Sequence, residues 1–382
     1  MTPDEWHIRL FGMDVDEAEH DARHNLVEAI QWEIAARVLT LGVNVILDFG
    51  FWGKSEREDF RARAARLGAS CEIHFLNFSE EILFERLAKR NAQHLPNTTS
   101  MNLTFLGTAA ANAYTEGFCS CANCQQARKL GGRNLRKRSA ALINYDLLID
   151  LGPDVMTVAA MHNCPLTQVR YCLQTHAHAD HLDTSHFLSR SPGYGVVGAP
   201  RLHFYASAGT LRVAARLLER DCEPHSFFDP EIGERLNLEI HQIEALQQFT
   251  MGHYRVTAFT ANHDRFVESL LYAIESDGRG IFYGTDTNIL PEETWRGFHQ
   301  HKLCFDVVIL DHTYGPDKTG SDHLIAEKFI EHVARMRDEK LLEEGARILA
   351  THISHDANTV HAELAEFAAR HGYEVAYDGM TV

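Results

Sequence analysis

The seven residues from Thr175 to His181 constrain most strongly what this chain can fold into. Three histidines and an aspartate fall within six positions here, directly after the apolar, β-leaning run Val169–Leu173, so they occupy the loop after a buried strand. Clustered imidazoles repel one another when charged, and polar side chains buried without partners cost free energy. A divalent cation removes both penalties, because neutral imidazole and carboxylate are good ligands for it. The run therefore predicts a metal site.

The spacing inside this run favours two ions. Side chains of an extended segment alternate between its two sides, so His176 and His178 project to the same side. Asp180 and His181 are adjacent and cannot both join that side. They suit a second ion beside the first. We therefore expect a dinuclear centre at the end of this strand.

Length, charge and composition restrict the class of protein to which this chain can belong. The chain has 382 residues, enough for two domains, and a formal net charge of -17, which disfavours tight binding to nucleic acid. No apolar run approaches the roughly 20 residues of a membrane span, and the first residues lack a signal-peptide pattern. We expect a soluble, cytoplasmic protein. One basic cluster is expected to form either a solvated loop or a phosphate-facing surface. It comprises Arg128, Lys129, Arg133, Arg136, Lys137 and Arg138.

Residues 1–92 have the pattern of a small α/β segment. Apolar residues at helical spacing predict a helix over 26–41, and a second helix is expected over 55–67. Between them, the run 45–47 predicts a short buried strand. Residues 93–100 are polar and aperiodic, which indicates a linker before a second domain over 101–382.

The N-terminal segment resembles the latter part of small P-loop kinases of the zeta-toxin and chloramphenicol-phosphotransferase type. Those kinases begin with a strand and a Gly-rich Walker A loop, and both are missing here. Without backbone N–H groups and a lysine to hold phosphates, the resemblance implies a truncated, inactive segment. The matching stretches are Pro3-Asp4-Glu5-Trp6, Leu47-Asp48-Phe49-Gly50-Phe51-Trp52 and Arg86-Leu87-Ala88-Lys89-Arg90-Asn91.

Four predicted strands of the second domain stop at a residue that can bind a metal. After the strand that precedes His176, the others are followed by His263, Asp286 and His352. Residues at strand ends converge where a cleft forms at one edge of a sheet pair. The mixture of strands and helices from residue 101 onward fits two sheets covered by helices. These residues are therefore expected to complete two sets of ligands.

Three of the eight cysteines lie within six residues of one another. Cys119, Cys121 and Cys124 are clustered in a chain without a secretory signal, which favours a metal over disulfides. Three thiolates and one imidazole would complete a closed, tetrahedral zinc site of the structural kind. The alternative is three free thiols on an exposed loop.

Residues 101–382 resemble the metallo-β-lactamase superfamily through the His-x-His-x-Asp-His motif, and within it the PhnP-type phosphodiesterases. The latter likeness is carried by the Cys-x-Cys-x-x-Cys insertion, by Ser321-Asp322-His323 and by the stretch from Thr351 to Met380. It implies a four-layered αββα sandwich. It also implies ligand sets: His176, His178 and His263 for one ion, Asp180, His181 and His352 for the other, Asp286 bridging both, and His355 as the fourth ligand of the cysteine site.

The same resemblance implies the activity. It predicts a metal-dependent phosphodiesterase of phosphonate catabolism that opens 5-phosphoribosyl 1,2-cyclic phosphate to the 1,5-bisphosphate by attack of a hydroxide bridging two ions. The ions would be Mn²⁺ or Zn²⁺, with one structural Zn²⁺ in addition. His323 would be the general acid and Asp286 the bridging catalytic carboxylate. An exposed histidine near a helix start is the alternative for His323.

Other activities use the same metal cleft. A tRNase Z-like nuclease would need a basic surface or an RNA-gripping arm, which the acidic second domain does not show. Thioester or lactone hydrolases lack the cysteine insertion, and a non-enzymatic scaffold would not need a complete ligand set. The expected partners are a small phosphorylated sugar as substrate and a second copy of the chain in a homodimer, with no membrane and no nucleic acid.

Overall fold

The computed structural model describes Pro3, Trp6 and residues 17–47, 53–72, 101–263, 265–266, 268–316 and 318–382. The chain divides into two compact units, Met1–Ala88 and Lys89–Val382. The predicted linker, 93–100, and most of the kinase-like stretches lie outside the described residues. Among the helices of the described residues, none is long and apolar enough to cross a membrane.

The first unit contains two helices in its described part, α2 (Glu17–Thr40) and α3 (Lys54–Arg66). Both predicted helices are therefore confirmed. They pack through an edge-to-face contact between Trp32 and Phe60, with ring centroids 5.3 Å apart. The strand predicted at 45–47 is wrong: these residues have no regular structure, and Ile46 is 83% exposed. A short apolar run does not by itself specify a strand, because strand formation depends strongly on the tertiary context.

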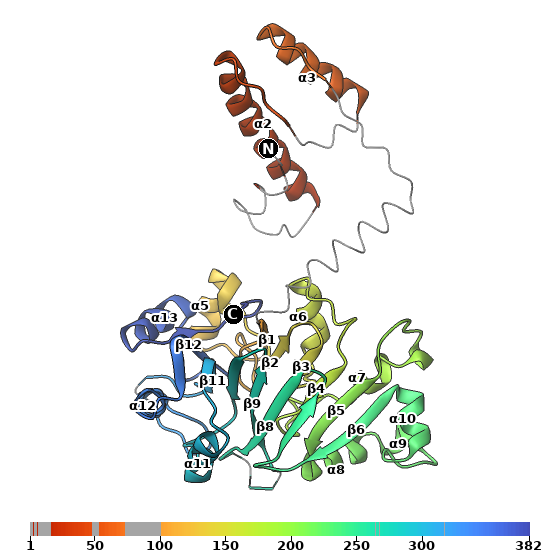
Figure 1. Ribbon diagram of the computed structural model, residues 1–382, viewed down its shortest axis with the longest axis vertical. Coiled ribbons are helices and arrows are strands. Elements are labelled where there is room, and N and C mark those ends of the chain that lie inside the picture. The colour runs from red at the N-terminus through yellow and green to blue at the C-terminus, as the bar shows by residue number, and fades with distance from the viewer. Residues whose placement is uncertain are drawn as a thin grey trace. The chain divides into compact units, whose positions relative to one another are not determined.

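The second unit is built on two sheets (Figure 1). The first sheet has the strand order β1-β2-β3-β4-β5-β6 and the second β13-β12-β11-β10-β9-β8-β7. The strands of the first are β1 (Leu103–Gly107), β2 (Ala140–Ile143), β3 (Leu147–Ile149), β4 (Tyr171–Leu173), β5 (Leu202–Ser207) and β6 (Leu238–Ile243). Those of the second are β7 (Gln248–Met251), β8 (Tyr254–Thr260), β9 (Leu270–Ser276), β10 (Arg279–Gly284), β11 (Phe305–Asp311), β12 (Leu342–Thr351) and β13 (Glu374–Val375).

Helices cover the outer face of each sheet. The helices of this unit are α5 (Ala122–Leu130), α6 (Val155–Met161), α7 (Ser185–Ser189), α8 (Ala208–Leu217), α9 (Glu219–Cys222), α10 (Pro230–Leu236), α11 (Glu292–Gln300), α12 (Ala326–Asp338) and α13 (His361–Arg370). Alternation along β10 shows the layering, because Ile281 and Tyr283 enter the core between the sheets while Phe282 packs toward Phe298 of α11. A third core lies between the first sheet and α6 to α10. The predicted αββα sandwich is confirmed.

Strand direction places several strand ends along one edge of the second sheet. β10, β11 and β12 run parallel, and β8 has the same direction because it is antiparallel to β9, which is antiparallel to β10. In the first sheet, β3, β4, β5 and β6 are also parallel to one another. The carboxyl ends of parallel strands meet at one edge of a sheet, where ligands bind in α/β proteins.

Candidate metal centre

The three-histidine group predicted for one ion is brought together by the loops after β4 and β8. His176 Nε2 lies 2.9 Å from His178 Nδ1, which lies 3.2 Å from His263 Nε2. Two ring nitrogens at such distances repel through their lone pairs unless a proton or a cation lies between them. Burial, followed by the charge of His181, lowers the pKa of His176 well below its usual value. A neutral imidazole is the form that binds metal.

The second predicted group gathers around Asp286, which follows β10. His181 Nε2 lies 3.1 Å from one carboxylate oxygen of Asp286, and His352 Nε2 lies 3.1 Å from the other. Asp180 adds an oxygen 3.1 Å from His181 Nε2 and 3.6 Å from His352 Nε2. Asp286 Oδ1 is also 4.0 Å from His176 Nε2, in the first group. Asp286 therefore occupies the position between the two groups that a bridging ligand requires.

Hydrogen bonds behind the imidazoles aim their Nε2 atoms at this centre. The Nδ1 atom of His181 faces Asp150 at 2.7 Å, and that of His352 faces the Thr313 hydroxyl at 2.7 Å. His176 and His263 use Nδ1 in the same way, toward the Thr175 hydroxyl and the Asp322 carbonyl. Such partners fix the ring orientation of metal-binding histidines.

Two of these Nε2 atoms are left without a satisfactory partner in the described structure. His181 Nε2 and His352 Nε2 are fully buried and make no hydrogen bond of acceptable geometry, although carboxylate oxygens lie 3.1 Å away. Burial opposes charge on His181, yet the carboxylates of Asp286, Asp180 and Asp150 raise its pKa well above the usual value. A divalent cation would balance the negative charge of these carboxylates and accept the lone pairs of the buried imidazole nitrogens. The side chains present therefore fit metal ions.

Two carboxylates that support the centre were missed by the sequence analysis. Asp150 follows β3 and accepts hydrogen bonds from the Thr175 backbone N–H and the His181 ring, both at under 3 Å. Asp311 ends β11 and faces His323 Nδ1 at 2.6 Å. Each stands directly at the end of an apolar strand, as the predicted ligands do, and that placement is the signal that could have revealed them.

The backbone is strained at three of these strand ends. Asp150, Asp286 and His352 have φ values of 64°, 56° and 59°, in the left-handed region that residues other than glycine rarely adopt. Such conformations persist only where surrounding contacts hold them, and they cluster at functional sites. Here they turn the chain sharply where each strand stops, which brings the side chain into the centre.

His323 lies beside the two groups and is buried, so it is not an exposed histidine. Its ring stacks on His352 with centroids 5.0 Å apart and lies 4.7 Å from the His263 ring. Burial would lower the pKa of His323, but the Asp311 carboxylate raises it to about 9. The Asp311 carboxylate therefore favours the protonated form of His323 beside the two groups.

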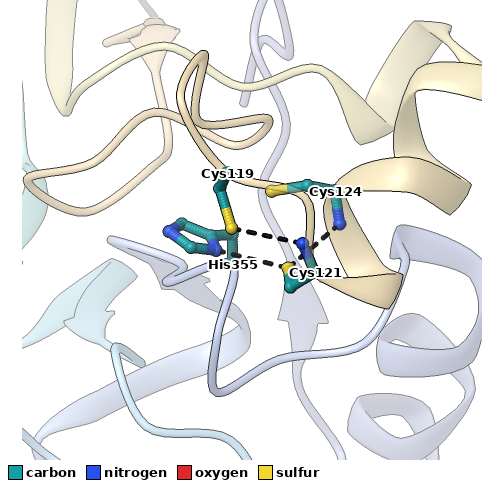
Figure 2. A group of neighbouring side chains, drawn as sticks. All are labelled: Cys119, Cys121, Cys124 and His355. Carbon is teal, nitrogen blue, oxygen red and sulfur yellow. Dashed lines mark hydrogen bonds between the residues drawn. The ribbon is translucent and has the colours of Figure 1, made fainter.

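The cysteine group is assembled from two segments that are far apart in the sequence (Figure 2). Cys119, Cys121 and Cys124 surround His355, which follows β12, and their ligand atoms lie within 4.8 Å of one another. Cys121 Sγ is 3.7 Å from His355 Nδ1. Sulfur at about 2.3 Å and nitrogen at about 2.0 Å from one tetrahedral zinc ion would lie roughly 3.5 Å apart. The group has the composition and spacing of a structural zinc site.

The local charges also suit zinc. Burial would raise the pKa of the Cys121 thiol, but hydrogen bonds from the Cys124 backbone N–H and from His355 outweigh it and lower the pKa to about 6. A thiolate at neutral pH is the form that binds zinc. The three cysteines and His355 therefore form one connected group, which three free thiols on a loop would not do.

Three arginines of the basic cluster form hydrogen bonds to other residues of the protein. Arg136 is fully buried and bonds the Thr108 hydroxyl at 2.8 Å, and Arg138 pairs with both oxygens of Asp154 at 2.8 Å. Arg128 donates to the carbonyls of Glu116 and Cys119 and so braces the cysteine loop. The solvated-loop interpretation does not describe Arg136, which is buried, whereas Arg128 and Lys129 are exposed on α5.

This fold and this arrangement of His and Asp side chains define a metal-dependent hydrolase. A family model described as a beta-lactamase superfamily domain matches residues 145–353, more than half of the chain. The chain therefore belongs to the metallo-β-lactamase superfamily, whose members bind divalent metal. A second model, an AAA domain, matches residues 1–104, in keeping with the kinase-like segment.

Solved structures share the fold at low sequence identity. A diphosphatase of the PhnP family matches with a TM-score of 0.56 at 21% identity, covering 74% of this chain and 97% of its own. Zinc-bound PqqB from Methylobacterium extorquens matches with a TM-score of 0.57 at 18% identity, covering 74% and 99%. The short form of human tRNase Z matches with a TM-score of 0.50 at 17% identity, covering 74% and 98%. No curated protein matches the sequence.

Proposed function

We propose that residues 101–382 form a phosphodiesterase that opens a cyclic ribose phosphate, 5-phosphoribosyl 1,2-cyclic phosphate, to the 1,5-bisphosphate in phosphonate catabolism. Two cations, Mn²⁺ or Zn²⁺, would be held by the two groups around Asp286, and one structural Zn²⁺ by the cysteine group. The observation that carries the proposal is the combination of the Asp286-centred groups with a cysteine group whose histidine, His355, lies on the loop that carries His352.

The proposed ligands divide between the ions as their distances suggest. His176, His178 and His263 would hold one ion, and Asp180, His181 and His352 the other, with Asp286 shared between the two groups. When bound, the ions would supply Lewis acidity: they lower the pKa of a water and neutralise the phosphate oxygens.

His323 would complete the reaction by protonating the leaving group. A water releases one proton to solvent and its oxygen forms a bond to phosphorus, while the bond from phosphorus to the ribose 2-oxygen breaks. His323 passes its Nε2 proton to that oxygen and regains a proton from solvent. Asp311 holds Nδ1 at 2.6 Å, which leaves Nε2 as the proton donor toward the cleft. Asp311 thus acts as a positioning residue for His323.

Hydrolysis of the cyclic ribose phosphate should be compared with hydrolysis of bis(p-nitrophenyl) phosphate, with Mn²⁺ or Zn²⁺ added to the full-length chain. We expect a strong preference for the cyclic sugar, measured as kcat/KM. A linear diphosphate ester should be tested beside them, because a PhnP-family structural neighbour is a diphosphatase. Preference for the diphosphate, or for RNA 3′ ends, would overturn the substrate assignment while leaving the metal-dependent hydrolysis in place.

Replacement of His323 should separate its role from metal binding. In His323→Ala, kcat on the cyclic sugar should fall by about 10²- to 10⁴-fold, the usual contribution of a general acid. Hydrolysis of bis(p-nitrophenyl) phosphate should change little, because nitrophenolate leaves without a proton. Bound metal, counted by mass spectrometry, should stay at the wild-type level. Equal losses on both substrates would contradict a general-acid role.

A further inference from the structure

A second cluster of metal-binding side chains lies on the first sheet, apart from the centres described above. His203 is on β5, and Glu239 and His241 are on the adjacent strand β6. His203 pairs with Glu239 in the parallel register, and His241 lies two residues further on, so all three project from the same face of the sheet. The catalytic groups follow the carboxyl ends of strands, whereas His203 stands near the beginning of β5.

The distances within this cluster match one ion with three ligands. His203 Nδ1 lies 3.1 Å from His241 Nε2, and the two carboxylate oxygens of Glu239 lie 3.6 Å and 3.5 Å from these nitrogens. Ligand atoms at about 2.0–2.1 Å from one tetrahedral zinc ion lie roughly 3.3 Å apart. No large movement of the three side chains is therefore needed to place an ion between them.

Aromatic packing holds the two imidazoles in this arrangement. The His241 ring stacks on Tyr205 with centroids 4.3 Å apart, and Tyr205 stacks in turn on Phe249 of β7. The His203 ring packs against Tyr171 at 5.7 Å. Rings fixed in this way lose little conformational freedom on binding an ion.

The cluster also has the exposure that an ion site open to solvent requires. The side chains of His203 and His241 are 31% and 29% exposed, so water can reach the fourth position. Glu239 contributes the negative charge, and Arg201 approaches it only to 3.7 Å. The set of two imidazoles and one carboxylate favours zinc, nickel or copper over calcium or magnesium, which prefer oxygen ligands.

We propose that His203, Glu239 and His241 bind one transition-metal ion of the Zn²⁺ class, with a water completing its coordination. The ion would join β6, the last strand of the first sheet, to its neighbour β5. An edge strand is hydrogen-bonded to a neighbouring strand on one side only, and an ion bound by both strands would strengthen that attachment. The proposal does not depend on the substrate of the catalytic cleft.

The test counts zinc in the full-length chain by mass spectrometry after chelator treatment and equilibrium dialysis against rising free Zn²⁺. We expect the double variant His203→Ala/His241→Ala to bind one ion per chain fewer than wild type at saturation. Glu239→Gln should bind the same ion more weakly. His225→Ala, which removes an exposed imidazole paired only with Asp229, should match wild type. Circular dichroism of the metal-free chains should show that all variants are folded.

A second measurement locates the ion. Zn²⁺ should slow amide hydrogen exchange of β6 in wild type and in His225→Ala, and leave it unchanged in the double variant. Equal zinc content in wild type and double variant at every Zn²⁺ concentration would overturn the proposal, because the cluster would then be a hydrogen-bonded histidine pair with a carboxylate. If the double variant fails to fold, the zinc content of Glu239→Gln decides, and wild-type affinity there overturns the proposal as well.

Discussion

Asp286→Ala is expected to abolish hydrolysis and to lower the bound divalent metal, because it removes the only described carboxylate that reaches both groups of the centre. Its Oδ1 atom lies 3.1 Å from His352 Nε2 in the second group and 4.0 Å from His176 Nε2 in the first. The loss of activity should exceed the roughly 10- to 100-fold decrease that follows removal of a residue hydrogen-bonded to a metal ligand. Turnover of the cyclic sugar and metal content by mass spectrometry measure the two effects.

The matched controls separate ligation from backbone strain. Asp286→Asn keeps the shape and tolerates the left-handed backbone, so it should also lose activity if the carboxylate charge is what matters. Asp277→Ala removes another aspartate with a positive φ, 49°, from the turn between β9 and β10, and should retain wild-type activity. Full activity in Asp286→Ala would rule out a dinuclear centre bridged by this residue.

Cys121→Ser is expected to lose one zinc ion per chain and a large part of the stability. Cys121 is central to its group, with its sulfur 3.4 Å from the Cys124 backbone nitrogen and 3.7 Å from His355 Nδ1. Loss of a structural metal belongs to the few mechanisms that change the free energy of unfolding by about 4 kcal/mol or more. Thermal melting and zinc content report the result.

A cysteine outside the group provides the control for this variant. Cys304→Ser changes a half-buried thiol beside β11 and should leave the zinc content unchanged. Because the side chains of the cleft stay in place, Cys121→Ser should still bind the ions around Asp286, with reduced turnover caused by looser placement of His352. An unchanged melting temperature together with unchanged zinc content would show that the cysteine group holds no structural ion.

The sequence predicted those parts of the centre that have a local signature. The run from His176 to His181 is dense enough to be recognised alone, and the strands before His263, Asp286 and His352 are apolar and short. The αββα layering was implied by the family resemblance, and the mixture of strands and helices was compatible with it. His355 was predicted as a member of the cysteine group only from the family resemblance, and in the structure it lies beside the three cysteines.

The parts that the sequence did not reveal depend on which strands become neighbours. A single aspartate after a strand, such as Asp150 or Asp311, looks like an ordinary turn residue until β3 lies beside β4 and β11 between β10 and β12. The group of His203 and His241 likewise exists only in the parallel register of β5 and β6. The strand predicted at 45–47 was wrong because a short apolar run does not by itself decide between a strand and irregular structure.

The pairing of Cys121 with His355, which are 234 positions apart, sets a condition on biosynthesis. The segment with the three cysteines leaves the ribosome long before its histidine and His352 are synthesised. Contacts of such long range form slowly during folding. Zinc capture by the complete four-residue group would therefore have to follow the synthesis of His355, and it would coincide with the arrival of His352 at the centre.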